Sequence, residues 1–181
     1  MALTKQDIEN IQIDYGIVYI NYGETDQKLL GPTRGGGEFV ATATIRDIEY
    51  DGSKGKTKGM QVVDDITAQL NVTSLNSSMD TLKTALPFAK YDDVTGKLSV
   101  GSDSVGVISD EAYLKNITMF AKTVKGEYKK ITLYNALSEN GLTFAAAPKA
   151  EGTIALNVYA HWDATDDTKN LFEIEDVESI E

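Results

Sequence analysis

Residues 62–73 read VVDDITAQLNVT, and the alternation of apolar and polar side chains in this stretch decides the fold class. The apolar set is Ile66, Ala68, Leu70 and Val72, with a polar residue between each pair. Successive side chains of a β-strand point to opposite faces of a sheet. The pattern therefore predicts a strand with one face in the core.

The same alternation occurs on the other side of a loop rich in lysine and glycine. Residues 38–50 read EFVATATIRDIEY and alternate from Phe39 onward. A cluster of turn-forming residues, GPTRGGG at 31–37, stands before them. We therefore predict two long strands joined by a loop over residues 50–60.

The loop, YDGSKGKTKGM, contains the Gly55-Lys56-Thr57 ending of a phosphate-binding motif. That motif also needs an earlier glycine and a position between a strand and a helix. Tyr50 stands where the earlier glycine is required, and a predicted strand follows the loop. Nucleotide binding is therefore not expected here.

Alternation predicts strands elsewhere in the chain as well, at residues 11–22, 113–124, 128–137, 141–147 and 153–162. In the first of these strands one face carries a regular apolar set, while the opposite face is mixed. The regular set is Ile11, Ile13, Tyr15, Ile17 and Tyr19. Asn140-Gly141 is a strong hairpin signal before the strand at 141–147.

One helix is predicted after the strand at 62–73. Ser77 and Asp80 have the spacing of a helix N-terminal cap, and Met79, Leu82 and Leu86 share one helical face. The helix should end near Leu86 because a proline follows. The elements together predict a mainly β, mostly antiparallel domain with seven or more strands and one packed helix, either a sandwich or a barrel.

Composition limits the classes of function. The chain has 181 residues, no cysteine and a formal net charge of −11. The acidic balance opposes general binding to nucleic acid phosphates. No apolar run reaches the length of a membrane span, and residues 1–10 lack the blocks of a signal peptide, so we expect synthesis in the cytoplasm and no membrane partner.

We expect one folded domain at residues 1–162, with an N-terminal arm, followed by an acidic tail at 163–181. The tail has eight acidic residues and one lysine, a net charge of −7. This composition favours a solvated tail. Its apolar residues could instead order the tail against a neighbour. They are Leu171, Phe172, Ile174, Val177 and Ile180.

No catalytic or metal-binding constellation is visible. His161 is the only histidine. Asp103 stands where the GxSxG motif of a serine hydrolase requires serine. A possible calcium loop starting at Asp47 has Lys58 at the position of the required glutamate. We therefore predict no enzyme activity, no cofactor and no metal ion.

Several segments occur in a recognisable order. They are GPTRGGGEF at 31–39, RDIEYDGSKGKTKGM at 46–60, the capped helix, and the strands between residues 128 and 163. Over residues 10–162 this order resembles the major tail tube proteins of long-tailed bacteriophages, most closely those with non-contractile tails of the siphovirus type. The positions that match the family's pattern are Arg46, Asp51, Gly52, Lys58 and Gly59.

The resemblance implies a fold of two antiparallel sheets with a flanking helix, like that of the haemolysin-coregulated proteins of type VI secretion. It also implies hexameric rings that stack into the tail tube of a virion, with tape-measure and tail-end proteins as partners. DNA would pass through an acidic lumen without specific binding. Chain pairing at open sheet edges has a physical basis, because unpaired edge N–H and C=O groups can bond a second chain.

From this resemblance we expect the charged loop to contact another copy of the chain, in the next ring or beside it. The loop residues concerned are Tyr50, Asp51, Gly52, Lys54, Lys56 and Lys58. Their expected partners are tail acids of the neighbour, namely Glu173, Glu175 and Asp176. A solvated hairpin is the alternative, since exposed ion pairs contribute little.

A second function class remains open from the sequence. A β-sandwich carbohydrate-binding or adhesion module would present aromatic side chains on one sheet face. The candidates for such a face are Tyr15, Tyr19, Tyr113, Tyr134 and Tyr159.

Overall fold

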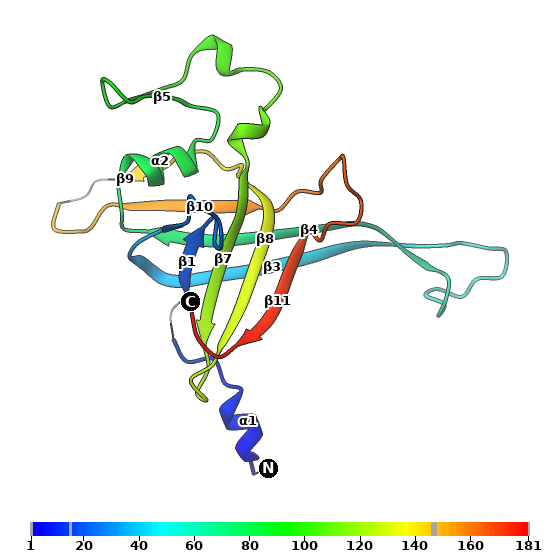
Figure 1. Ribbon diagram of the computed structural model, residues 1–181. Helices are drawn as coiled ribbons and strands as arrows, with labels where there is room; N and C mark the ends of the chain where they lie inside the picture. The colour runs from blue at the N-terminus through cyan, green and yellow to red at the C-terminus, as the bar shows by residue number, and fades with distance from the viewer. Residues whose placement is uncertain (1, 15, 146–147, 181) are drawn as a thin grey trace.

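The alternating segments form two antiparallel sheets that pack face to face (Figure 1). The computed structural model describes residues 2–14, 16–145 and 148–180. The first sheet has the order β2-β1-β7-β8, with β11 on the other side of β8. Its strands are β1 (Ile17–Ile20), β2 (Lys28–Leu29), β7 (Leu114–Lys122), β8 (Tyr128–Ser138) and β11 (Phe172–Val177).

The second sheet has the order β10-β4-β3, and β9 pairs with the other side of β10. A short pairing of β8 with β10 links the two sheets at one corner. The sheets do not close into a barrel, because β2 and β3 remain as ends of the strand order. The strands are β3 (Thr33–Asp47), β4 (Gln61–Ser74), β9 (Phe144–Ala145) and β10 (Thr153–Tyr159). The predicted mainly β class is confirmed, in its sandwich form.

The core lies between the two sheets. Leu70 and Val72 of β4 and Leu156 of β10 are buried on the second sheet, and Ile117 and Leu133 face them from the first. Full burial of one such aliphatic side chain stabilises the fold by about 1.5–3 kcal/mol. The predicted core face of β4 is therefore confirmed at Ala68, Leu70 and Val72.

The N-terminal strand differs from the prediction in length and in orientation. β1 covers only Ile17–Ile20, and its buried residues are Val18 and Ile20 rather than Ile17 and Tyr19. Tyr19 instead packs edge-on against Phe120 on the outer side of the first sheet. The prediction was wrong because both faces carry apolar residues, and periodicity alone does not say which face another sheet will cover. Tyr15 lies outside the described residues.

Residues before β1 form a short helix that the sequence reading missed, α1 (Lys5–Glu9). Thr4 and Asp7 cap it reciprocally, and none of its residues is buried. A backbone bridge between Gln12 and Thr123 ties the segment after the helix to the sandwich.

The predicted helix is α2 (Met79–Ala85), which lies against β8 and β10. Its N-cap is Ser78, one residue later than predicted, and the Ser78 side chain accepts a hydrogen bond from the Thr81 N–H. Its buried residues are Thr81, Thr84 and Ala85, whereas Met79 is exposed. The expected Met and Leu face was therefore wrong at Met79, because the helix meets the sheet with its small side chains.

The segment between α2 and β7 projects as a separate excursion (Figure 1). It contains a small hairpin and two 3-10 turns. These are β5 (Lys90–Asp92), β6 (Lys97–Ser99), η1 (Ser102–Ser104) and η2 (Asp110–Ala112).

The predicted hairpin at Asn140-Gly141 does not form between neighbouring strands. β9 pairs with β10 rather than with β8. Residues 146 and 147 of the predicted strand lie outside the described residues. The two-residue turn signal was overridden because the end of β8 already pairs with β7 at Ala136 and with β10 at Leu137 and Ser138.

Candidate functional site

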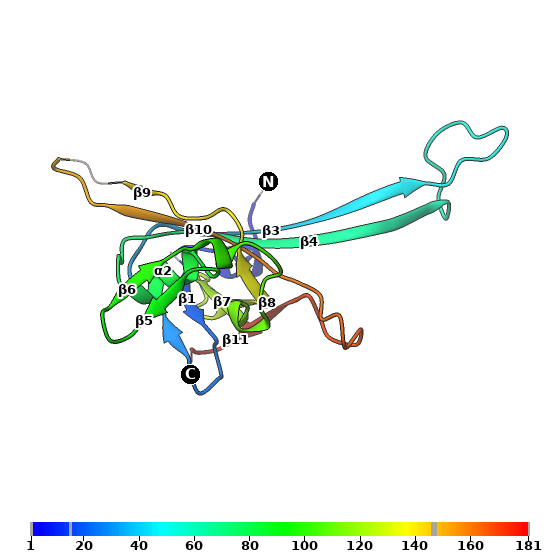
Figure 2. The same cartoon turned by 90° about the horizontal axis from the view of Figure 1, so that it is seen from above.

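The β3–β4 hairpin extends far beyond the sandwich, and we call its outer part, residues 41–67, the arm. Figure 2 shows the arm leaving the body on one side. The two strands remain paired out to Asp47 and Gln61. Apart from Thr57 and Met60, which are half-buried, each residue of the arm is exposed. The arm is therefore held by its own ladder of hydrogen bonds and not by packing.

One face of the arm continues the face that forms the core. Phe39 pairs with Leu70 in the sandwich, and further out Ala43 pairs with Ile66 and Ile45 with Val63. Paired residues share a sheet face, so this apolar stripe runs from the core into solvent. In the arm, Ile45 is 57% exposed and Val63 is 53% exposed. The alternation predicted Ile66 on the core face of its strand, but Ile66 is 38% exposed, so this expectation was wrong for the outer part of β4.

The opposite face of the arm is polar and internally paired. A register shift follows Thr44, and beyond it the Arg46 guanidinium Nε donates to Asp64 Oδ2 at 3.0 Å. On the face of the apolar stripe, the last pair of the ladder is polar, and Gln61 Nε2 donates to Asp47 Oδ1 at 2.8 Å. These side-chain bonds tie β3 to β4 where no core supports them.

The predicted site residues at the loop lie at the end of the arm. Ser53 N–H bonds to the Tyr50 carbonyl and Met60 N–H to the Thr57 carbonyl, which gives two successive turns. Gly55 has a φ of 113° and is needed there because other residues rarely adopt that value. The loop joins two antiparallel strands, which is not the strand-to-helix setting of a phosphate site.

The three lysines of this loop, Lys54, Lys56 and Lys58, are exposed. Within the described residues none of them makes an ion pair or a side-chain hydrogen bond. By contrast, the lysines of the sandwich at 115, 129 and 130 each contact a carboxylate. The loop thus concentrates uncompensated positive charge at the point farthest from the core.

The predicted acidic partners lie on β11, away from the arm. Glu175 contacts Lys130 at 2.7 Å, and Asp176 contacts Lys129. Glu173 accepts hydrogen bonds from Asn170 Nδ2 at 2.6 Å and from the Tyr134 hydroxyl at 2.9 Å. All three carboxylates thus already bond to their own chain.

These contacts shift two pKa values. Hydrogen bonds from Asn170 and Tyr134 hold the pKa of Glu173 below its usual value. Burial, together with the hydrogen bond to Glu173, raises the pKa of Tyr134 to about 12. Residues 172–177 of the tail thus form an ordered strand, β11, and Leu171, which precedes this strand, is buried.

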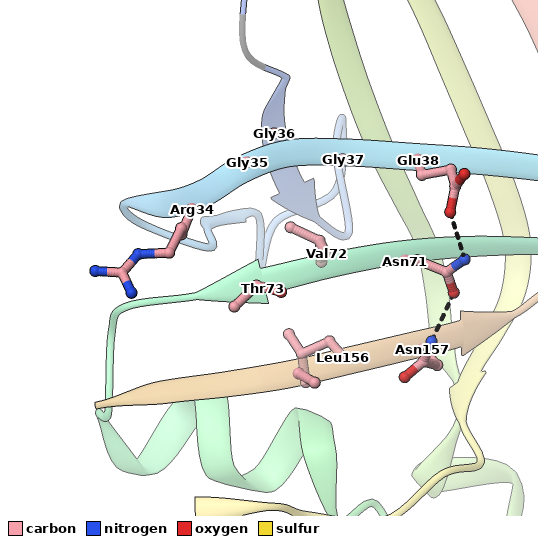
Figure 3. A pocket seen from close by; sticks show the side chains of 11 residues that line it. Arg34, Gly35, Gly36, Gly37, Glu38, Asn71, Val72, Thr73, Leu156 and Asn157 are labelled. Atoms are coloured by element: carbon pink, nitrogen blue, oxygen red, sulfur yellow. Dashed lines mark hydrogen bonds between the residues drawn. The ribbon is translucent and has the colours of Figure 1, made fainter. Parts of the chain in front are cut away.

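The outward face of the second sheet carries a polar ladder across three strands. Asn71 Nδ2 donates to Glu38 Oε2 at 3.2 Å, and Asn157 Nδ2 donates to Asn71 Oδ1 at 2.7 Å (Figure 3). A hollow of about 210 Å³ opens beside this ladder at the bulge formed by residues 35–37. The lining of the hollow includes the amides of Asn71 and Asn157 and the hydroxyl of Thr73.

The tyrosines proposed for a carbohydrate-binding face are divided among separate elements. Tyr19 and Tyr134 belong to the first sheet, Tyr159 belongs to the second, and Tyr113 precedes β7. Tyr134 is bonded to Glu173, and Tyr113 packs edge-on against His161. They do not share a single sheet face.

A search for groups of three or more metal-ligating side chains finds none within residues 2–14, 16–145 and 148–180. In that same part of the chain, no helix has the length and apolar character needed to cross a bilayer.

No family model matches the sequence, and no curated protein matches it either. Among solved structures, the chain is similar to a chain of the virion of a native gene transfer agent particle, at 10% identity and a TM-score of 0.47. That alignment covers 90% of this chain and 96% of the other. A chain from the tail of an empty gene transfer agent particle with C6 symmetry aligns over the same shares, at 10% identity and a TM-score of 0.43. At these scores the likeness carries no functional argument.

Proposed function

We propose that this chain is the structural subunit of a bacteriophage tail tube, which assembles into hexameric rings that stack into a conduit for DNA. The observation that carries the proposal is the arm, whose core-like apolar stripe leaves the sandwich uncovered. Its place would be the virion tail after synthesis in the host cytoplasm, with tape-measure and tail-end proteins as further partners.

An uncovered apolar stripe on a projecting hairpin favours association. Exposed apolar surface in a soluble protein usually marks an interface. A two-fold contact of the stripe with itself would stop at a dimer, so in a ring the stripe would contact a different part of the next copy. Such head-to-tail contacts give closed rings or open stacks.

The sheet edges supply a second kind of contact. Within the described residues β3 pairs only with β4, which leaves one side of a 15-residue strand without a partner strand. A long open edge invites pairing with another chain. Pairing of this edge with the β9–β10 side of the next copy would join the second sheets of successive subunits around a ring.

In such a ring the polar face of the second sheet would line the lumen. The two arginines on this face are already paired, Arg34 with Glu151 and Arg46 with Asp64. A lining without free cations would not grip phosphates, because binding to DNA is driven by basic groups that release counterions. DNA would then pass without specific binding.

The loop at the end of the arm would reach a neighbouring copy, with Tyr50, Asp51, Gly52 and the three lysines at 54, 56 and 58 in the contact. The β11 acids Glu173, Glu175 and Asp176 are one acceptor for these lysines. To bind the lysines, these three carboxylates would have to release or share the groups that they now contact in their own chain.

The decisive test is a shortened arm. Residues 45–63 and the bulge residue 64 are replaced by Asn-Gly, so that Thr44 and Asp65, which are paired in the ladder, flank a two-residue turn. The sandwich should keep its melting temperature because the removed residues lie outside the core. Rings and tubes formed by the full chain, seen by negative-stain microscopy and sedimentation, should disappear.

Two results would contradict the proposal. One is a full chain that stays monomeric at about millimolar concentration, together with binding to immobilised oligosaccharides, as expected of a carbohydrate-binding module. The other is a shortened variant that forms tubes as readily as the full chain. A matched control removes the β5–β6 turn at residues 93–96, which is equally exposed, and should leave assembly unchanged.

A further inference from the structure

A second feature of the surface lies at the corner where β10 ends. Here a cavity of about 460 Å³ opens between η2 and the segment after β10. Asp110, Tyr113, His161, Trp162 and Asp163 line it, and we call it the Trp162 pocket. Trp162 is the only tryptophan of the chain and is 55% exposed.

The inner wall of the pocket is fixed by hydrogen bonds. His161 Nδ1 lies 3.0 Å from the Asn135 carbonyl oxygen, and His161 Nε2 lies 3.0 Å from Glu139 Oε1. Asn135 Nδ2 donates a hydrogen bond to the His161 carbonyl oxygen at 3.2 Å. The Tyr113 ring packs edge-on against the imidazole, with 5.2 Å between the ring centroids. The shape of the pocket therefore exists before any ligand arrives.

The rim of the pocket is acidic. Asp163 accepts bonds from Lys169 and from Thr165, and these bonds hold the pKa of its carboxyl well below its usual range. Asp110, which lines the pocket, is exposed and forms no ion pair with any described residue. Lys169 is the one cation on the rim segment 163–170, and it is shared by two aspartates.

Aromatic faces beside free carboxylates recognise a cationic side chain. An ammonium group is attracted to the face of a tryptophan or tyrosine ring and to the carboxylates around it. The same chain carries matching groups in the three unpaired lysines of the arm loop. In both views the loop lies away from the segment after β10, so the two cannot meet within one copy (Figures 1 and 2).

We infer that the lysine loop of one copy docks in the Trp162 pocket of the next copy. This inference rests on the proposed function, in which the loop contacts a neighbouring copy, and it identifies the surface of that copy on which the loop docks. The pocket is a better acceptor than β11, since Asp110 has no competing cation, whereas Glu175 and Asp176 already pair with lysines. The contact joins two different surfaces, as head-to-tail stacking requires.

The test uses charge reversal on the full chain. A loop variant carries Lys54→Glu, Lys56→Glu and Lys58→Glu, and a pocket variant carries Asp110→Lys. Each should raise the concentration at half-assembly by about tenfold or more, because like charges then meet across the contact. Combining both sets in one chain should restore assembly to within about threefold of the unmodified chain. Asp93→Lys, an exposed acid in the β5–β6 turn, is the control for added charge and should have no effect.

Trp162 fluorescence separates this inference from the proposed function. A peptide of residues 48–60 is titrated into the full chain at a concentration at which it is monomeric. The Trp162 emission should shift, and the pocket variant should not respond. A shift in a chain that never assembles supports the pocket contact and overturns the tube. Normal assembly of the pocket variant overturns the pocket contact and leaves the tube standing. An emission that responds to oligosaccharides but not to the peptide identifies a glycan pocket and overturns the contact.

Discussion

The two halves of the β3–β4 hairpin have the same strands and the same alternation but opposite surroundings. In the inner half, Ala68, Leu70 and Val72 are at most 4% exposed. In the outer half, Val63 and Ile66 continue the same face and are 53% and 38% exposed. The inner half is covered by the first sheet, including Phe172 of β11, whose ring lies 5.1 Å from Phe39. The comparison teaches that a strand pattern specifies a face but not what will cover it.

The largest expected effect tests burial directly. Leu70→Ala in the inner half should destabilise the monomer by about 2–5 kcal/mol, because it leaves a cavity in a close-packed core. Ile66→Ala in the outer half should change stability by about 1 kcal/mol or less, since it removes little buried area. Denaturant unfolding of the two variants measures the difference. Equal losses would mean that the arm is packed in the monomer.

A second effect concerns close packing under the inner half. A Cβ atom added at Gly37 would lie 2.6 Å from Met119 Sδ. Gly37→Ala should therefore destabilise by about 1–3 kcal/mol through overpacking. Met119→Ala in the same chain should relieve part of that loss in a double-mutant cycle.

The matching change in the outer half is Gly59→Ala, where φ is 84° and no atom lies within 4 Å of the added Cβ. Its loss of about 1–2 kcal/mol comes from backbone conformation alone. The Met119→Ala substitution should not change the stability loss caused by Gly59→Ala. A rescue at Gly59 as large as that at Gly37 would contradict the packing explanation.

A third prediction sharpens the role of the apolar stripe. Ile45→Asp should leave the unfolding free energy of the monomer within about 0.5 kcal/mol, as at other exposed positions. It should raise the half-assembly concentration about tenfold, equivalent to about 1.4 kcal/mol per contact. Thr44→Asp, on the polar face of the same arm, is the control. Sedimentation velocity over a concentration series measures the half-assembly concentration of both variants. Equal values for Ile45→Asp and Thr44→Asp would mean that the stripe is not part of the interface.

The smallest expected effect concerns β11, which helps to cover the inner half of the β3–β4 hairpin, and this effect depends on pH. The pKa of Tyr134 is raised to about 12 from an ordinary value of 10. A raised pKa in the folded state contributes stability that is fully present below pH 10 and is lost as the pH rises toward 12. Ionised Tyr134 would no longer donate to Glu173 and would be repelled by it.

Thermal unfolding between pH 9 and pH 12 should therefore show a modest extra loss of stability in the unmodified chain, and Tyr134→Phe should reduce that slope. An unchanged slope in the variant would assign the pH dependence to groups other than Tyr134.

Much of the architecture was predictable because strand geometry is local. The strands at 61–74, 128–138 and 153–159 followed from their alternation, and β3 followed from Glu38 onward, whereas its first five residues lie in the cluster that was predicted as a turn. The orientation of β1 was not predictable, since Ile17 and Tyr19 alternate as regularly as Val18 and Ile20. The correct face depended on contacts with β7, which is about a hundred residues away in sequence.

The candidate site was predictable in its charge but not in its position. The lysines and glycines of the loop were visible in the sequence, and they lie at a hairpin tip as their turn-forming residues indicate. The tail acids were also visible, but their lysine partners on β8 were not, because that pairing joins residues about 45 positions apart. The Trp162 pocket had no local signal, since its walls come from segments before β7, within β8 and after β10.

The sequence by itself determined the strand periodicity, the side of each long strand that is apolar, the acidic balance and the charged loop. These properties depend on neighbouring residues and on backbone geometry. Only the tertiary structure decided where the sandwich ends along β3 and β4, which acids are already paired, and that Trp162 lines a cavity. Those properties depend on which distant segment covers a surface, and burial is a relation between two surfaces that neither segment specifies alone.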